Sequence, residues 1–375
     1  MDLDVMLGDL AVLVECESFS ADHRAVARSA GVVGEFGERL LGVAAETVVI
    51  EGVSHLRWSF GEPRVLLLGH HDTVWPMGTL GRIPWSVVDG VARGPGVFDM
   101  KAGLVQMFHA LAGLSSLEGV CVLVTGDEEL GSPTSRGLIE ESARGCAAAF
   151  VMEASADGGA LKIARKGTSN YELVVHGRSS HAGLDPGKGL NAGVELAHQV
   201  LALDGLAARV NGANPARTGR PGELGPVTVT PTLSSAGTTT NTVPAQARVA
   251  VDVRVPTVAA QHRVDELIRA LTPRIAGTRL EVLGGPNRPP LEPDSSAELF
   301  ALAQRVAADL SLGPLEGAGV GGASDGNFTA GVGCPTLDGL GAVGGGAHAE
   351  GEHVIVAEMP GRAALLRGLI EAVRA

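Results

Sequence analysis

Three short, almost wholly apolar runs constrain the fold of this chain more than any other feature. They span residues 65–69 (VLLLG), 120–125 (VCVLVT) and 147–152 (AAAFVM). Such runs are typical of strands that are buried on both faces of a sheet. Helical patterns separate them, and in residues 100–111 apolar side chains recur at helical spacing, with Asp99 expected as the N-cap. The alternation predicts an α/β sheet.

The chain has 375 residues, a length that favours two domains. From about residue 167 the pattern changes to strand, helix, strand and helix, including the alternating strand 245–255 (AQARVAVDVRV). We therefore expect an α+β domain at 168–287, inserted between two parts of the α/β domain at 1–167 and 288–375. Further helices are expected at 296–310 and 359–373.

Charge and composition exclude several classes of partner. The formal net charge is −13, which disfavours nucleic acid and anionic membrane surfaces. The first ten residues do not resemble a signal peptide, and no stretch has about 18 consecutive apolar residues. We expect a cytoplasmic protein that acts on a small molecule. The four cysteines, Cys16, Cys121, Cys146 and Cys334, are interpreted as reduced core residues.

Each of the three apolar runs is followed by residues that can bind a cation. His70 follows the first, Asp127, Glu128 and Glu129 follow the second, and Glu153 ends the third. In open α/β sheets the ligand crevice lies beyond the carboxyl ends of the strands, so these side chains should converge. Clustered carboxylates repel one another or become protonated unless a countercharge is present. A pair of divalent cations would supply that countercharge.

Two further segments suit such a centre. Asp99 lies in a glycine-rich turn that enters a helix, and His348 follows a glycine-rich approach near the C-terminus. Imidazole and carboxylate ligands together suit zinc, with cobalt or manganese as possible substitutes. Each residue taken alone is better explained as a solvated loop residue, and only the whole set favours a metal. A hydrogen-bond network and plain solvent are the alternatives for His70 and its neighbours.

Several motifs, in order, carry a resemblance to a known family. They are GHHDTV, GPGVFDMKAG, TGDEELGS, ME, GRSSHAG, NTVP and GAHAEGEHV. The sequence resembles the zinc-dependent exopeptidase and acylase family that includes glutamate carboxypeptidase, aminoacylases and acetylornithine deacetylase. The resemblance implies a catalytic domain with a mixed sheet and helices on both faces, and an inserted α+β lid or dimerisation domain.

The resemblance also implies a ligand set for two zinc ions. His70 and Glu153 would bind one ion, Glu129 and His348 would bind the other, and Asp99 would bridge both. It further implies a cis peptide bond between Asp99 and Met100.

Other site residues follow from the same resemblance. Asp72 would orient His70, and Glu128 would be the general base that accepts a proton from the attacking water and returns it to the leaving amine. The alternative for Glu128 is a surface carboxylate that caps the next helix. His71 is expected to line the site in an undefined role, and His55 is expected on the surface.

The resemblance alone assigns roles to two residues of the inserted domain. His181 (GRSSHAG) would reach the active site of a partner subunit and stabilise the oxyanion of the tetrahedral intermediate, which implies a homodimer formed through the lid domain. Asn241 would be a further lid residue near the same oxygen or the substrate. Without the resemblance, His181 would be a lone histidine in a loop of small residues.

The substrate prediction depends on Arg288 (NRPPL). It matches the position that holds the α-carboxylate of the substrate in glutamate carboxypeptidases, although an ordinary surface arginine at the domain hinge is the alternative. Arg165 and Lys166 are left as groups that attract an acidic substrate or pair with lid carboxylates. We expect a metal-dependent hydrolase that cleaves an amide bond next to a free carboxylate, in an N-acyl amino acid or short peptide. The alternatives are a deacetylase of ornithine or diaminopimelate derivatives and a binding protein without turnover.

Overall fold

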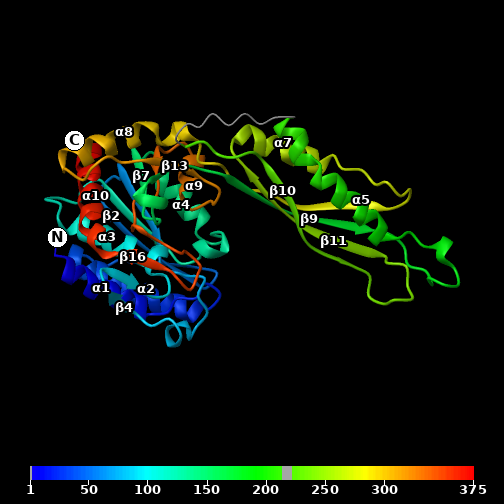
Figure 1. Cartoon of the computed structure of the whole chain (residues 1–375), viewed down its shortest axis with the longest axis horizontal. Coiled ribbons are helices and arrows are strands. Elements are labelled where there is room, and N and C mark those ends of the chain that lie inside the picture. The colour runs from blue at the N-terminus through cyan, green and yellow to red at the C-terminus, as the bar shows by residue number, and fades with distance from the viewer. Residues whose placement is uncertain (1, 213–221) are drawn as a thin grey trace. The chain divides into compact units, whose positions relative to one another are not determined.

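The computed structural model describes residues 2–212 and 222–375. These residues form two compact units. The first contains residues 2–164, 222 and 291–375, so both ends of the chain lie in it (Figure 1). The second contains residues 165–212 and 223–290. None of the helices in these described segments is long and apolar enough to cross a membrane.

A six-stranded sheet forms the centre of the first unit. Its strand order is β1-β2-β6-β3-β7-β14. The strands are β1 (Glu46–Ile50), β2 (Val53–Phe60), β3 (Val65–His70), β6 (Val120–Thr125), β7 (Ala148–Val151) and β14 (Thr336–Leu337). β6, β3, β7 and β14 run parallel to one another, whereas β2 pairs antiparallel with β6, and β1 antiparallel with β2. The predicted mixed sheet is therefore confirmed.

Both faces of this sheet are covered by helices. Alternate residues of β3 enter two different cores: Val65 and Leu67 belong to one, and Leu66 and Leu68 to the other. The larger core includes residues of α1 (Leu3–Glu15), α2 (His23–Leu41), α3 (Ala102–Ala112), α8 (Pro293–Asp309) and α10 (Met359–Arg374). The smaller core includes residues of α4 (Arg136–Ala143) and α9 (Gly326–Gly331). Burial on both faces explains why β3, β6 and β7 contain almost no polar residue.

Short strands complete the first unit. β4 (Ser86–Val88), β5 (Val91–Arg93), β15 (Gly344–Gly345) and β16 (His353–Ile355) form a four-stranded sheet in the order β15-β16-β5-β4. β8 (Leu161–Arg165) pairs with β13 (Gly317–Val320). The first of these sheets holds the segment between β15 and β16, which contains His348, against the chain that leads to Asp99.

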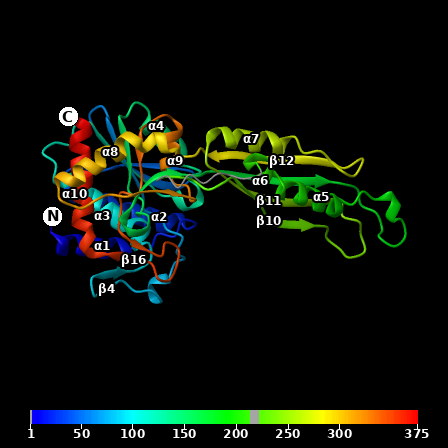
Figure 2. The same cartoon turned by 45° about the horizontal axis from the view of Figure 1, so that its top comes forward.

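The second unit is an antiparallel sheet with helices. Its strands are β9 (Gly167–His176), β10 (Thr228–Ala236), β11 (Gln246–Val255) and β12 (Arg279–Arg288), in the order β10-β11-β9-β12. Burial alternates along β11, as the sequence pattern predicts. Helices α5 (Ala192–Asp204), α6 (Leu206–Asn211) and α7 (Val258–Arg269) pack with the sheet around one apolar core (Figure 2). Side chains of Asn191 and Thr257 cap α5 and α7.

Candidate active site and metal centre

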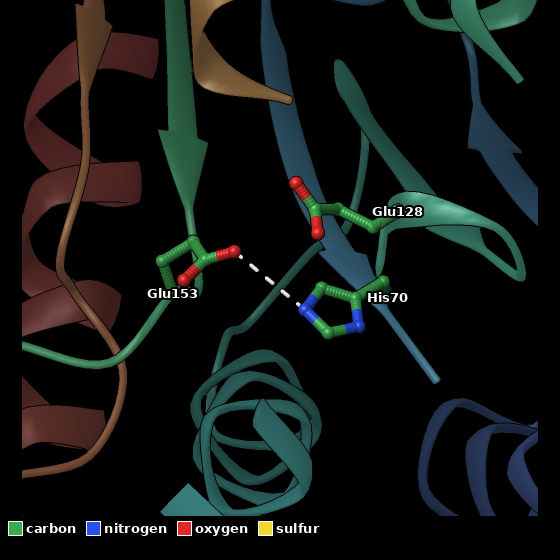
Figure 3. Close-up of side chains that lie close together, drawn as sticks. All are labelled: His70, Glu128 and Glu153. Carbon is green, nitrogen blue, oxygen red and sulfur yellow. Dashed lines mark ion pairs between the residues drawn. The ribbon is translucent and has the colours of Figure 1, made fainter. Parts of the chain in front are cut away.

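The carboxyl ends of three neighbouring parallel strands carry the candidate ligands. His70 is the last residue of β3 and lies opposite Thr125 of β6, so Glu128 and Glu129, in the turn after β6, emerge beside it. Glu153 follows β7, whose Val151 is in register with Leu68 of β3. Figure 3 shows His70, Glu128 and Glu153 converging from these three segments. The sheet topology thus brings together groups that are far apart in the sequence.

Asp99 lies between two histidines. Its Oδ1 atom is 3.3 Å from Nε2 of His70, and its Oδ2 atom is 3.3 Å from Nε2 of His348. Nε2 of His70 is also 3.6 Å from Oε1 of Glu153, and Nε2 of His348 is 3.1 Å from Oε2 of Glu129. The other four residues therefore form two pairs, one on each side of Asp99.

Glu128 lies in the same cluster. One potential ligand atom from each of His70, Glu128 and Glu153 lies within 4.8 Å of the others, and the same holds for His70, Asp99 and Glu129. Glu128 is 8% exposed, so it is not a solvated surface carboxylate. A buried carboxylate next to the ligand cluster can exchange a proton with a molecule bound there.

Asp99 does not cap helix α3, and the prediction of an N-cap was wrong. The residue has non-helical backbone angles (φ −117°, ψ 93°) in the turn Val97–Lys101, and α3 begins at Ala102. Its peptide bond to Met100 is cis, as the resemblance implied. Asp99 does not cap the helix because its amide N–H donates to the carboxylate of Glu352 (3.0 Å) and its own carboxylate faces the histidines. Long-range contacts, rather than the helix, determine its conformation.

Asp72 supports both the histidine and the glutamates. Nδ1 of His70 lies 3.0 Å from the main-chain oxygen of Asp72 and 3.5 Å from its carboxylate. The same carboxylate accepts the amide N–H groups of Glu128 and Glu129, both at 3.2 Å, and the hydroxyl of Ser20 at 2.7 Å. Ser20 was missed in the sequence because it has no distinctive neighbours. Asp72 therefore joins the end of β3 to the turn after β6.

Two buried histidines lie beneath the cluster. Nε2 of His71 donates to the main-chain oxygen of Ser54 (3.1 Å), and burial lowers the pKa of His71 to about 4, so its ring is neutral and holds β2. His55 is fully buried, and the expected surface position was wrong. Its Nδ1 accepts the amide N–H of Gly126 (3.2 Å), and its Nε2 lies 3.0 Å from the hydroxyl of Thr134. The ring of His71 thus binds β2, and the ring of His55, in β2, binds the segment that leads from β6 to Glu128.

The electrostatics of the cluster favour a cation. Burial lowers the pKa of His70, but contacts with Asp72, Asp99 and Glu153 outweigh that effect and raise it well above its usual range. Contacts with Asp99 and Glu129 raise the pKa of His348 to about 10. Positive charge is therefore stabilised at both histidines. A metal ion can replace those protons, because ligand histidines bind in their neutral form.

The donor atoms also fit a metal. Nε2 of His70 and Oδ1 of Asp99 are buried, and neither has a hydrogen-bond partner among the described residues. Buried polar atoms rarely lack a partner. Two imidazoles and three carboxylates match the mixed nitrogen and oxygen ligands of zinc, which cobalt and manganese can replace. The residues present therefore fit the group that the sequence predicts.

The remaining predicted site residues belong to the second unit. Nδ1 of His181 accepts the amide N–H groups of Gly183 (3.1 Å) and Leu184 (3.0 Å), so a neutral ring carries its proton on Nε2. Asn241 lies beside it, because the main-chain oxygen of Asn241 accepts the N–H of Ala182 (2.9 Å). His181 and Asn241 are both exposed. Arg288 ends β12 and is buried.

Comparisons with solved structures agree with the fold. Aminopeptidase PepT from Bacillus cereus superposes with a TM-score of 0.72 over 100% of both chains at 20% identity. An M20 family metallo-carboxypeptidase, Sso-CP2 from Sulfolobus solfataricus, gives a TM-score of 0.72 at 17% identity, covering 100% of this chain and 99% of that one. The predicted fold class, a mixed α/β catalytic domain with an inserted second domain, is confirmed.

Sequence comparison identifies the family. The chain is 29% identical over 327 residues to carboxypeptidase G2 from Pseudomonas sp. (strain RS-16), covering 83% of this chain and 74% of that protein. It is 27% identical over 340 residues to succinyl-diaminopimelate desuccinylase from Methylorubrum populi, covering 82% of each. The profile of Peptidase family M20/M25/M40 matches residues 66–372. The protein is thus a hydrolase of the amide-cleaving, metal-dependent class, and the chain belongs to Peptidase family M20/M25/M40.

Proposed function

We propose that the protein is a two-metal amide hydrolase that cleaves an amide bond next to a free carboxylate. The observation that carries the proposal is the position of Asp99, with one carboxylate oxygen 3.3 Å from each of two histidines. In this proposal His70 and Glu153 would hold one zinc ion, Glu129 and His348 would hold the other, and Asp99 would be shared by both, with cobalt or manganese as substitutes. Bound divalent cations polarise an amide carbonyl and lower the pKa of water.

Glu128 is the proposed general base. It takes a proton from the attacking water and later returns it to the nitrogen of the leaving amine. Its burial and its place beside His70 and Glu153 support this role. The hydrogen bond from its amide N–H to Asp72 holds its backbone in place. Asp72 is the proposed residue that keeps His70 and this turn aligned.

His181 is the proposed oxyanion donor, acting on the active site of a partner subunit in a homodimer that forms through the second unit. Its Nδ1 already accepts two backbone N–H groups. A proton on Nε2 is therefore available for donation to a developing negative charge. Asn241, which is hydrogen-bonded to the same loop, is the proposed second polar group near that oxygen.

The proposed substrate is an N-acyl amino acid or a short peptide. The likeness to carboxypeptidase G2 supports cleavage next to a C-terminal carboxylate, and Arg288 is the proposed partner of that carboxylate. A second candidate, deacylation of an N-acyl diamino acid, is favoured by the likeness to succinyl-diaminopimelate desuccinylase over 82% of both chains. Hydrolysis of a panel of N-benzoyl, N-acetyl and N-succinyl amino acids separates the two.

The test of the mechanism is Glu128→Gln. We expect kcat to fall by roughly 10²–10⁴-fold, the usual contribution of a general base, while the metal content stays at the wild-type level. Glu62→Gln, which changes an exposed carboxylate ahead of β3, is the matched control and should retain activity. If Glu128→Gln kept full turnover with bound metal, the assignment of the base would be wrong. If the active wild-type protein contained no transition metal, the whole proposal would fail.

A further inference from the structure

One buried carboxylate outside the proposed ligand set receives four hydrogen bonds. Oε2 of Glu352 accepts the indole N–H of Trp75 (2.7 Å) and the amide N–H of Gly96 (2.9 Å). Oε1 accepts the amide N–H groups of Phe98 (2.9 Å) and Asp99 (3.0 Å). Glu352 is 1% exposed. An ionised carboxylate offers about four acceptor sites, so this carboxylate is saturated by donors.

Three of these four donors come from the turn that carries Asp99. Gly96, Phe98 and Asp99 lie before α3, which begins at Ala102, so their amides have no partner in its hydrogen-bond ladder. Gly96, Phe98 and Asp99 donate instead to a single side chain. Since buried N–H groups are nearly always paired, the conformation of the turn depends on that side chain.

Glu352 belongs to the same loop as His348. The amide of Ala349 donates to the oxygen of Gly346, and the amide of Glu352 donates to the oxygen of Ala349, both at 2.9 Å. β16 follows directly at His353 and pairs with β5. The loop therefore contacts Asp99 twice: His348 faces its carboxylate, and Glu352 binds its amide. One short segment thus carries one candidate ligand and binds the backbone of another.

We propose that Glu352 is a positioning residue that presets the distance between Asp99 and His348 for metal binding. The inference rests on the proposed function, because it takes these two residues as ligands. Without Glu352 the ligands remain, but the turn and the loop are no longer joined. Groups that orient metal ligands in this way typically account for 10- to 100-fold in metal affinity.

Glu352→Gln tests the role with almost no change in shape. The amide group that replaces one oxygen is itself a donor, and it meets two N–H groups in either orientation. In the full-length protein we expect the dissociation constants for Zn²⁺ and Co²⁺, measured by competition with a chelating dye, to rise by about 10- to 100-fold. The visible absorption spectrum of the Co²⁺ form should also change. In the metal-free protein, amide hydrogen exchange at residues 96–99 should accelerate.

Glu350→Gln is the matched control. It makes the same chemical change two residues earlier, at an exposed side chain that pairs with Arg82 (3.0 Å). It should keep the wild-type metal affinity, Co²⁺ spectrum and hydrogen exchange. Trp75→Phe removes the indole donor together with part of the ring and leaves the three backbone donors to Glu352 in place. It should weaken metal binding by a few fold, and it is the variant to test if Glu352→Gln does not fold.

The outcomes separate the two proposals. Wild-type metal affinity in Glu352→Gln, or in Trp75→Phe if the first variant does not fold, overturns the positioning role and leaves the proposed function intact. Failure of the wild-type protein to bind metal overturns the proposed function. Even in that case, unchanged hydrogen exchange at residues 96–99 in Glu352→Gln overturns the inference by itself.

Discussion

Replacing Asp72 with asparagine should weaken both the fold of the first unit and turnover. The carboxylate accepts Glu128 N–H on Oδ1, and Glu129 N–H together with the Ser20 hydroxyl on Oδ2. Asparagine keeps one acceptor oxygen. In either orientation of the amide, its NH₂ group faces one of the two backbone N–H groups, whereas the hydroxyl of Ser20 can rotate to accept.

The magnitude follows from the one lost contact. A hydrogen bond to a charged group is worth about 1.5–3 kcal/mol, so Asp72→Asn should lower the free energy of unfolding by about 2 kcal/mol. A domain of 150–250 residues shifts by about 2–4 °C per kcal/mol, so the Tm of the first unit should fall by about 4–8 °C. Because a misplacement of about 1 Å can cost 10²-fold in rate, kcat/KM should fall by roughly 100-fold as the turn that holds Glu128 loosens.

The assay has two parts. Thermal unfolding of the metal-free protein measures the loss of stability, and hydrolysis with saturating metal measures the loss of turnover. Ser20→Ala serves as the comparison, since it removes a neutral donor, leaves both backbone hydrogen bonds in place and should cost less on both measures. If Asp72→Asn unfolded at the wild-type temperature with wild-type kcat/KM, the carboxylate would not hold the turn, and the reasoning would be refuted.

Three other predictions concern packing, pH and metal. Gly103→Ala places a new Cβ 2.2 Å from the main-chain oxygen of Met152. It should therefore destabilise the first unit by about 1–3 kcal/mol in thermal unfolding, whereas the same substitution in a helix with open space around it stabilises. A raised Tm would contradict this packing. Burial lowers the pKa of His55 below its usual 6.5 despite the opposing charges of Asp127 and Asp72. The unfolded chain therefore takes up the proton first, and stability that is present above pH 6.5 is lost as the pH falls. His55→Gln should accordingly lose less stability between about pH 7 and pH 5 than the wild type. If the urea midpoints of the two proteins fell equally between these pH values, the prediction would be wrong. Finally, Zn²⁺ at 100 times its Kd should stabilise the chelator-treated protein by about 2.7 kcal/mol, and an unmoved Tm would show that the folded state does not bind the ion selectively.

Residue types alone predicted the centre of the first unit. The runs at β3, β6 and β7 are unusual because both faces of each strand are buried. The polar residues that follow them could be recognised because they stand directly after these apolar runs. Parallel neighbours then leave little freedom for where His70, Glu128 and Glu153 meet. The amphipathic pattern of α3 and the alternation along β11 were likewise sufficient.

Backbone contacts were not predictable in this way. A carboxylate that binds backbone N–H groups leaves no mark on the residues that donate, so neither Ser20 nor Glu352 stood out. The Asp99 error has the same origin, because its partner Glu352 is 253 positions away in the sequence. β1 and β2 lie in a stretch with weak patterning, and His55 was therefore taken as a surface residue although β2 buries it.

The carbonyl group of Met152 is enclosed by two glycines. A Cβ on Gly103 of α3, or on Gly341 in the segment after β14, would lie 2.2 Å from its oxygen. Three stretches of main chain thus touch without intervening side chains, immediately before Glu153. Because glycine has no side chain to shorten, a substitution at Gly103 or Gly341 cannot open this junction of the first unit and can only force the three segments apart.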